Sequence, residues 1–554
     1  MVGPIQRAFK KLGDLVKEID TPLSILDFQC VHPAARNCDP FPPQPLADLN
    51  SIDRNDPANA IVSMDVTLQF ETSRAWPDDL AAISRIKTAF YLKLAQQLRT
   101  EHDTPAAVGI DFIDIVVDGF AFRLRIFHDR QLLIHKADAI EVNKSKFIAQ
   151  AQRKGRALDA NELKEAEKNA NTEVGIELER SFVHRPVFAS SIKGLNQRFP
   201  VFNPTVHLVK RWLASHMLSE SLSTEAVELL VAYVFCCPMP YVAPSSAPCG
   251  LLRFLQLLSS RNFKEAPLIV DLYGDMKLGV FNAITEKFKA VRADGKGSAI
   301  FIATEKQPNS VWTAGTDPDA LADVVSTATL SMAHMKSLIE SSLTSPYSAS
   351  LNEVLWKSLF KASLQSYDLL IAVDPYLLPT YRQALSFLRF PPSQRSPPST
   401  VTKKMKKFKL PPGAVASDSL AKRPLPMIGF DPLDELLSDL REQFGRYCEL
   451  FADRYGSPII GVKWKKLPFG PSKFSVSHAA YTAPSKTGDA STASTGEKKK
   501  KKKGKQAAVI AAGAVITRVE PDVGSIASHI KVAGKGLIIG VYNNYEEFRK
   551  ASAK

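Results

Sequence analysis

The stretch from residue 198 to 259 constrains the fold most, because it predicts three helices in a fixed order. They are predicted from about Pro204 to Met217, from Ser223 to Phe235 and from Cys249 to Ser259. In the first, apolar residues recur every three or four positions, the spacing of a helix with one buried face. The opposite face carries Lys210 and Arg211. The pattern predicts a buried helical bundle with a basic rim.

The chain upstream of this bundle mixes helix and strand patterns. A strand is predicted from Ala60 to Glu71 and an amphipathic helix from Asp78 to Arg99. Two β-rich runs then flank Asp118 and Gly119, a dipeptide that favours the tight turn of a hairpin. Downstream, residues 351–554 again alternate helix and strand patterns. The fold class is therefore predicted to be α+β.

A chain of 554 residues is long for a single core, so several domains are expected. Two segments, 391–426 and 475–505, are rich in Pro and Lys or low in complexity and are predicted to be disordered. The predicted parts are an N-terminal connector over 1–50, an α/β domain over 51–197, a helical domain over 198–350 and a C-terminal α/β domain over 351–554.

The net charge of +14 and the pI of about 9.3 favour a polyanionic partner, although one lysine run supplies part of that charge. The six cysteines form no C-x-x-C pair, which is typical of buried thiols in a reducing compartment. The first ten residues lack the apolar core of a signal peptide. No stretch of eighteen apolar residues occurs, so no membrane partner is expected.

Sequence blocks in a fixed order carry a further signal. Within the helical stretch they are Val209–Trp212, Thr224–Leu230, Pro244–Pro248 and Gly250–Leu255. Elsewhere they are Leu68–Glu71, Trp76–Leu80, Lys87–Phe90, Gly119–His128, Phe430–Pro432 and Ile460–Lys465. The ordered set resembles the Nrap family, nucleolar RNA-associated proteins of early small-subunit ribosome assembly. The resemblance covers most of the chain, from about Leu26 to Tyr545.

The resemblance implies a fold and a cellular location. Residues 51–197 would be a degenerate nucleotidyltransferase-like domain, and residues 198–350 a helical domain like those of poly(A) polymerases and oligoadenylate synthetases. Family members are about twice this long, as two similar halves in tandem, so the chain would correspond to the second half. It would then be a fragment, a truncated gene model or a shortened paralogue. The implied location is the nucleus and nucleolus.

Nucleotidyl transfer needs carboxylates on neighbouring strand positions that hold two Mg²⁺ ions. Asp111, Asp114 and Asp118 lie on or near a predicted strand at spacings of three and four. Strand residues three apart point to opposite faces, so Asp111 and Asp114 cannot both face one metal. Asp65 is isolated between apolar residues, and no Gly-Ser turn precedes these acids. No catalytic residue, metal site or cofactor is therefore predicted.

RNA contact requires only positive charge within reach of the phosphate backbone. The candidates on ordered elements are Lys210 and Arg211 on the helix rim and Arg123 and Arg125 on the hairpin, and for each the alternative is a solvated face. The candidates in the segments predicted to be disordered are Lys403, Lys404, Lys406, Lys407, Lys409, Lys498, Lys499, Lys500, Lys501, Lys502 and Lys503. For these lysines the competing role is nuclear or nucleolar targeting.

Two functions follow as hypotheses. In the first, the chain is a non-catalytic scaffold of the small-subunit processome that binds pre-rRNA and protein partners during 18S rRNA maturation. The resemblance implies that these partners include a subassembly containing casein kinase and a small RNA-binding processome protein. The alternative is an active template-independent RNA nucleotidyltransferase, whose carboxylates would have to converge across the sheet.

Overall fold

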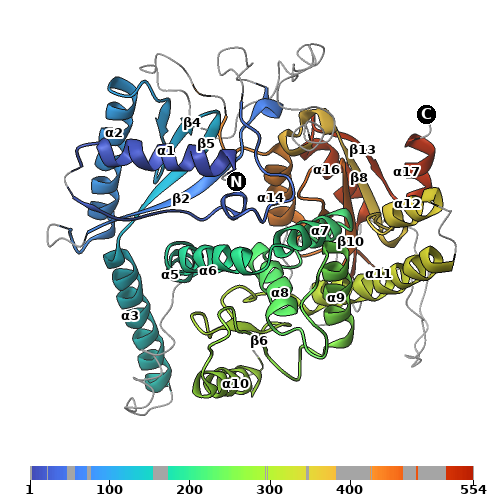
Figure 1. Ribbon diagram of the computed structural model, residues 1–554. Helices are drawn as coiled ribbons and strands as arrows, with labels where there is room; N and C mark the ends of the chain where they lie inside the picture. Colours follow the sequence, from blue (N-terminus) through green and yellow to red (C-terminus); the bar gives the residue numbers. More distant parts are fainter. Residues whose placement is uncertain are drawn as a thin grey trace, which may run out of the picture. The chain divides into compact units, whose positions relative to one another are not determined.

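The computed structural model describes residues 3–21, 23–46, 56–71, 76–153, 173–293, 297–344, 349–381, 427–465, 482–484 and 519–552, with the single residues 295 and 425. The chain forms two compact units. The first comprises residues 1–362, 375–431 and 453–457, and the second residues 363–374, 432–452 and 458–554. Figure 1 labels their helices and strands.

A five-stranded sheet organises the start of the first unit, with the order β1-β2-β5-β4-β3. Its strands are β1 (Ile25–Cys30), β2 (Ser63–Phe70), β3 (Ala106–Val108), β4 (Ile113–Val117) and β5 (Phe120–Phe127). The central pair, β2 and β5, is parallel, and the other pairs are antiparallel. The strand and the hairpin predicted from the sequence are confirmed, since β4 and β5 pair antiparallel across Asp118 and Gly119.

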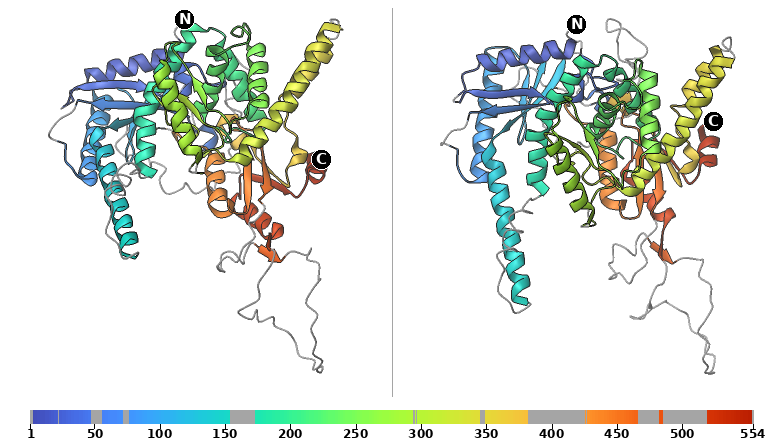
Figure 2. Two further views of the ribbon diagram at one scale, coloured as in Figure 1. Left: turned by 90° about the horizontal axis from the view of Figure 1, so that it is seen from below. Right: turned by 60° about the horizontal axis from the view of Figure 1, so that its bottom comes forward.

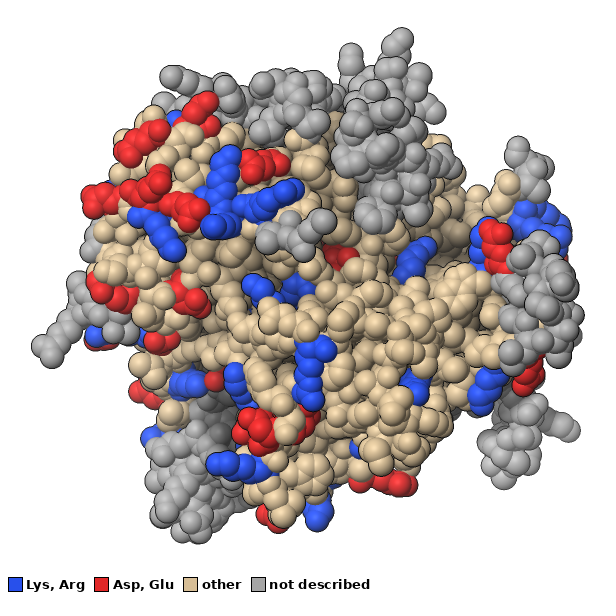
Figure 3. Space-filling view, in the orientation of Figure 1, with Lys and Arg blue, Asp and Glu red and all other residues tan. Residues whose placement is uncertain are grey.

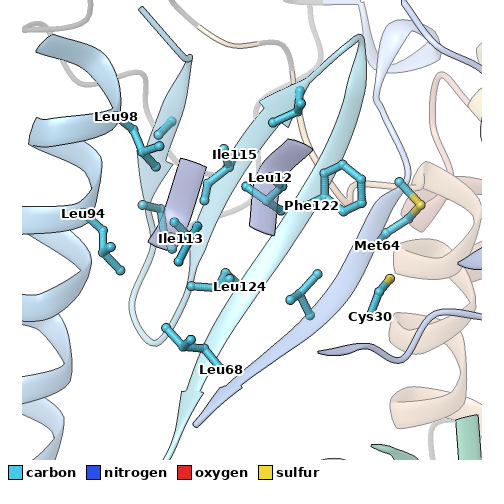
Figure 4. Close-up of a cluster of buried hydrophobic side chains, with 14 of the residues drawn as sticks. Leu12, Cys30, Met64, Leu68, Leu94, Leu98, Ile113, Ile115, Phe122 and Leu124 are labelled. Atoms are coloured by element: carbon cyan, nitrogen blue, oxygen red, sulfur yellow. The ribbon is translucent and has the colours of Figure 1, made fainter. Parts of the chain in front are cut away.

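Two helices, α1 (Pro4–Glu18) and α2 (Leu80–Thr100), cover one face of this sheet. Helix α1 buries Ile5, Ala8, Leu12 and Val16, whose spacing places them on one side of the helix. Figure 4 shows Leu12 among side chains of β2, β4 and β5, with Leu94 and Leu98 of α2 beside them.

The N-terminal connector predicted over 1–50 is therefore wrong for the described residues. Helix α1 belongs to the core of the first domain, and β1 pairs with β2 over five residues. The proline-rich composition of 40–45 suggested an extended linker, but the apolar face of α1 needs a partner to exclude water. The sheet supplies that partner.

A long helical segment follows β5. Helix α3 (Asp129–Arg153) projects away from the sheet, and Figure 2 shows this from two directions. Helix α5 (Glu173–Glu179) continues through a π-helical turn (Arg180–His184) into α6 (Arg185–Arg198). The charged, alanine-rich composition of residues 137–179 is typical of an exposed helix, and the described parts of this range are helical.

The helical domain contains the three predicted helices as α7 (Phe202–Ser215), α8 (Thr224–Cys236) and α9 (Ala247–Ser260). The hydroxyl of Ser223 caps α8 by accepting the amide N–H of Ala226. Helix α9 packs against α7 and α11 (Pro318–Thr344). Gly250 of α9 is required at this crossing, because a Cβ there would lie 2.5 Å from Oγ1 of Thr205.

A small parallel sheet of β6 (Leu268–Val270) and β7 (Ile302–Thr304) adjoins these helices. Helix α10 (Leu278–Ala293) connects the two strands, and α12 (Ala349–Ser358) follows α11. The apolar run from Gly297 to Ala303 is typical of a buried strand, but β7 begins only at Ile302. Among the described residues, no helix is long and apolar enough to cross a membrane.

The second unit contains an antiparallel sheet with the order β13-β8-β10-β9. Its strands are β8 (Leu369–Val373), β9 (Cys448–Ala452), β10 (Ile459–Trp464) and β13 (Ile538–Tyr542), and its helices are α14 (Pro432–Phe444), α16 (Val523–Ala533) and α17 (Tyr545–Ser552). The predicted C-terminal mixture of helix and strand is confirmed.

Most of the two segments predicted to be disordered lies outside the described residues. Two described parts of them are ordered and correct the prediction. Leu425 packs with Ile61 and Ile428 in a small apolar cluster. Strand β11 (Thr482–Pro484) pairs antiparallel with β12 (Val519–Pro521). Low local complexity does not prevent a strand from forming when a partner strand is available.

Candidate functional site

The face of the five-stranded sheet opposite α1 and α2 carries a row of charged side chains. Met64, Val66 and Leu68 of β2 point into the core, so Asp65 lies on the opposite face because strand residues alternate. Arg123 of β5 pairs in register with Asp65 on one side and with Asp114 of β4 on the other. An arginine therefore stands between two aspartates of neighbouring strands.

Arg123 is fixed in this row by four contacts. Its Nε and Nη2 each donate to one carboxylate oxygen of Asp114, both at 2.9 Å. Its Nη2 also donates to the carbonyl oxygen of Ile428 at 3.2 Å, and the guanidinium lies 4.0 Å from the ring centre of Phe112. This two-point pairing is the strongest that a carboxylate and an arginine make. The side chain of Arg123 is mostly buried. This contradicts both the predicted RNA contact and the alternative of a solvated face.

The pair stands in a partly dehydrated setting. Burial raises the pKa of Asp114, while the hydrogen bonds from Arg123 act in the opposite direction. Burial alone would lower the pKa of Arg123, but Asp114 raises it, so the guanidinium stays charged. Both oxygens of Asp114 are occupied by this cation.

Asp111 lies before β4 and has a different partner. The Nζ of Lys87 on α2 is 3.0 Å from a carboxylate oxygen of Asp111, and the side chain of Lys87 is only 1% exposed. Tyr91 donates to the backbone oxygen of Asp111 at 3.1 Å and accepts the amide of Ile126 at 2.8 Å. Asp111 and Asp114 thus have different partners, Lys87 of α2 and Arg123 of β5, and Asp111 lies outside the strand on which the prediction placed it. Within the described ranges, no group of three acidic, histidine or cysteine side chains is placed to hold a metal ion.

A short segment, residues 427–429, lies on the same face and is called the return segment below. The amide of Ile61 donates to the carbonyl of Met427 at 2.8 Å, and the amide of Gly429 donates to the carbonyl of Ile61 at 2.7 Å. Gly429 has a φ of +68°, and a Cβ there would lie 2.9 Å from Oγ of Ser63. Residues 427–429, far along the chain, therefore form backbone hydrogen bonds with Ile61, just before β2 and next to Arg123. Nothing in the sequence pattern of 425–429 indicated this contact.

Lys210 is not on a basic rim, which corrects the prediction. Its side chain is 7% exposed, and its Nζ lies 2.7 Å from Oε1 of Glu228 and donates to the carbonyl of Cys38 at 2.7 Å. The face of α7 opposite Val206 and Val209 is covered by residues 36–38, the N-terminal segment. Helical periodicity does not reveal such a cover.

Glu228 is the centre of this buried cluster. It is fully buried and accepts from Nε and Nη2 of Arg36 at 2.8 and 3.0 Å, in addition to Lys210. Burial would raise the pKa of Glu228, but Arg36 and Lys210 together lower it. Three charges therefore connect the N-terminal segment to the helical domain. An acid in the otherwise apolar run 226–235 was the available signal, because such a residue needs a buried cation.

The remaining RNA candidates fall into three situations. Arg211 is 38% exposed and lies 3.0 Å from Oδ2 of Asp453, with its guanidinium near the ring of Phe41. Arg125 is half-buried on β5, in register with Thr67. The candidate lysines at 403, 404, 406, 407, 409 and 498–503 lie outside the described residues. None of these candidates is brought together with another by the described structure.

One exposed basic face was not among the predicted RNA contacts, although residues 1–20 have the pattern of an amphipathic helix of basic character. Helix α1 presents Arg7, Lys10 and Lys11 to solvent at helical spacing, opposite its buried residues. Figure 3 shows basic side chains gathered over α1, with acidic side chains close by. Lys11 contacts Asp118 at 2.7 Å, and both side chains are about half exposed, so this pair adds little stability.

Three family models match the chain in succession. They are the Nrap protein nucleotidyltransferase domain 4 over residues 1–197, the Nrap protein PAP/OAS1-like domain 5 over 199–361 and the Nrap protein domain 6 over 364–541. The first begins at residue 1, which agrees with α1 and β1 belonging to the first domain. The predicted nucleotidyltransferase-like and poly(A) polymerase-like fold is confirmed by these matches.

Full-length relatives extend well beyond this chain. Nucleolar protein 6 of Xenopus tropicalis is 31% identical over 488 residues, which cover 86% of this chain and 38% of the relative. Nucleolar protein 6 of Homo sapiens is 28% identical over 475 residues, which cover 82% and 37%. The chain thus spans less than two fifths of these relatives. Their names confirm the predicted nucleolar location.

Solved structures give only distant likenesses. A cytoplasmic RNA terminal U-transferase matches with a TM-score of 0.32 and 13% identity over 65% of this chain and 92% of that one. The polymerase core of TRAMP, an RNA surveillance complex, matches with a TM-score of 0.30 and 12% identity over 65% and 88%. These scores carry no argument about activity. On the three successive domain matches and the relatives, the chain belongs to the Nrap family.

Proposed function

We propose that this chain acts in the nucleolus as a non-catalytic scaffold of the small-subunit processome. In this role it binds pre-rRNA and protein partners while 18S rRNA matures and the small ribosomal subunit assembles. Its membership of the Nrap family and the nucleolar names of its relatives support a role in ribosome biogenesis. The observation that carries the non-catalytic part is the position of Arg123 between Asp65 and Asp114.

Nucleotidyl transfer would require those carboxylates to face two Mg²⁺ ions. Both oxygens of Asp114 already accept from Arg123, and a divalent cation would have to displace a guanidinium of like charge. Asp111 is engaged by Lys87. The return segment at Met427–Gly429 also lies against this face. Each contact supports a role in holding structure.

A primer-extension assay tests this part of the proposal. The full chain would be incubated with a labelled RNA oligomer, each nucleoside triphosphate and Mg²⁺ or Mn²⁺. No added nucleotides are expected from the wild type. Extension that disappears in both Asp65→Asn and Asp114→Asn would overturn the non-catalytic proposal and favour the template-independent nucleotidyltransferase.

The RNA part is tested by ultraviolet crosslinking of the tagged chain in cells. Enrichment of pre-18S spacer and small-subunit rRNA is expected, because the net charge of +14 favours a polyanionic partner. Neutralising Lys403–Lys409 and Lys498–Lys503 should reduce that enrichment if these lysines bind phosphate. An absence of rRNA, with nuclear location intact, would leave an adaptor that binds only proteins.

The protein partners form a separate proposal. We expect them to include a subassembly containing casein kinase and a small RNA-binding processome protein. Affinity purification of the tagged chain after nuclease treatment should recover both. Their loss on nuclease treatment would mean that RNA, and not this chain, connects them.

A further inference from the structure

A rigid turn presents an aromatic side chain at the carboxyl end of β6. Asp271 accepts the amide N–H of Gly274 at 2.7 Å with one carboxylate oxygen and that of Met276 at 3.1 Å with the other. Gly274 has a φ of +79°, which favours glycine at this turn. The turn therefore holds Tyr273 at its tip. Both oxygens of the Asp271 carboxylate accept hydrogen bonds from backbone amides of the same loop.

Tyr273 is held in place and is nevertheless exposed. Its hydroxyl lies 2.9 Å from Oγ of Ser191 on α6 and accepts from Nζ of Lys306 at 3.3 Å. Its side chain is 47% exposed, a large value for an aromatic residue with two hydroxyl partners. Because its orientation is fixed, little conformational freedom is lost when a ligand stacks on its ring.

Two exposed cations from different elements lie close to Tyr273, one at its ring and one at its backbone. Nζ of Lys306, just after β7, lies 5.1 Å from the ring centre. Nη1 of Arg198, at the end of α6, donates to the carbonyl of Tyr273 at 3.5 Å. Both side chains are solvent-exposed, so they can reach an added anion. An exposed ring with basic side chains close by is an arrangement that binds a nucleobase together with its phosphate.

A pocket adjoins the ring at the carboxyl ends of β6 and β7. It is lined by Tyr273 and Lys306 and by Phe188, Ser191, Thr304 and Gln307. Glu305 lines the same pocket, and its carboxylate can accept a hydrogen bond from an exocyclic amino group of a base. The free space in this pocket is about that of one water molecule, so a base would lie on the exposed ring of Tyr273 and not inside the pocket.

We propose that the exposed surface at Tyr273, with Arg198 and Lys306 close by, is a nucleotide-binding site. The base stacks on Tyr273, and the phosphate lies between the two cations. The nucleotide is supplied by single-stranded RNA or as a free nucleoside triphosphate. The RNA source rests on the proposed RNA-binding function, whereas the free nucleotide does not.

Fluorescence anisotropy with the full chain tests the site, using labelled single-stranded polyadenylate and labelled ATP as separate probes. Tyr273→Ala should weaken binding about tenfold, the effect of one lost base–aromatic stack. Tyr273→Phe keeps the ring and should bind nearly as the wild type does. The double variant Arg198→Ala with Lys306→Ala should reduce the salt slope for RNA by about 1.4, as expected for two phosphate contacts on a single strand.

Tyr241→Ala is the matched control. Tyr241 is 49% exposed and has Arg253 4.3 Å from its ring centre, but it does not line the pocket. Its removal should leave binding unchanged. Thermal unfolding of each variant should match the wild type, because the replaced side chains are exposed.

Each result decides the proposal. Loss with Tyr273→Ala for polyadenylate alone identifies RNA as the source, and loss for ATP identifies the free nucleotide. Wild-type binding that Tyr273→Ala and the double variant leave intact would overturn the site while the RNA-binding function stands. If the wild type binds neither probe, the site is refuted, and crosslinking in cells then decides the proposed function separately. Binding of a protein at Tyr273, without either probe, would also refute it.

Discussion

The buried charge cluster around Glu228 gives the sharpest prediction of stability. Glu228 is fully buried and accepts three hydrogen bonds at 2.7 to 3.0 Å, two from Arg36 and one from Lys210. Glu228→Gln keeps the shape of this side chain but removes its charge. The amide also replaces one acceptor oxygen with an NH₂ donor, which would face another donor.

The expected loss is about 3 to 5 kcal/mol of unfolding free energy, the cost of leaving a buried charge without its partner. Arg36 and Lys210 are 4% and 7% exposed, so water cannot replace the carboxylate. The opposite outcome is expected when all three charges are removed together. Replacing Arg36 and Lys210 by Met and Glu228 by Leu should restore most of the stability, since no buried charge remains.

Urea unfolding of the full chain measures both effects. Fluorescence of Trp212 and Trp312, both buried in the helical domain, reports on the first unit. The midpoint should fall strongly in Glu228→Gln, with an unchanged slope. Lys93→Met, which removes the exposed pair with Asp20, should cost less than about 1 kcal/mol. A loss below about 1 kcal/mol for Glu228→Gln, or an apolar triple variant as unstable as Glu228→Gln, would refute the reasoning.

Three further predictions concern the sheet face and the N-terminal segment. Arg123→Ala should cost about 2 to 4 kcal/mol in urea unfolding, because Asp114 is left buried without its partner, and adding Asp114→Asn should recover part of it. Gly429→Val should cost about 1 to 2 kcal/mol, since it combines a φ of +68° with a close approach to a side chain of β2, and limited proteolysis should then cut near residue 429 faster; equal cleavage would contradict this. Burial lowers the pKa of His32 to about 3. His32 therefore takes up a proton near pH 6.5 in the unfolded chain but not in the folded chain. Stability should therefore be complete above pH 6.5 and fall as pH drops toward 3, and His32→Gln should flatten this decline in urea midpoints measured between pH 7 and 5.

Local patterns predicted much of the secondary structure. The hairpin at Asp118 and Gly119 forms as expected, because both residues adopt the positive φ that such a turn requires. The helices of the bundle also form within a few residues of their predicted bounds. These elements depend on periodicity and turn chemistry, which are properties of residues close together in the sequence.

Charged side chains were less predictable, because their partners lie far along the chain. Lys210 pairs with Glu228 on another helix, and Arg123 contacts Ile428 more than three hundred residues away. A surface lysine and a buried, paired lysine look alike in a helical pattern. Whether such a lysine is exposed or buried depends on which distant segment packs over it.

The sequence alone determined the α+β class, the three-helix bundle, the hairpin and the membership of the Nrap family, since these depend on local spacing and ordered blocks. It also separated Asp111 from Asp114 by the period of a strand, but Asp111 lies before β4 and is instead held by Lys87. Only the tertiary structure decided that α1 completes the first core, that Arg123 stands between two aspartates and that Arg198 and Lys306 lie close to Tyr273. The physical reason is that burial and charge pairing are set by contacts between distant segments.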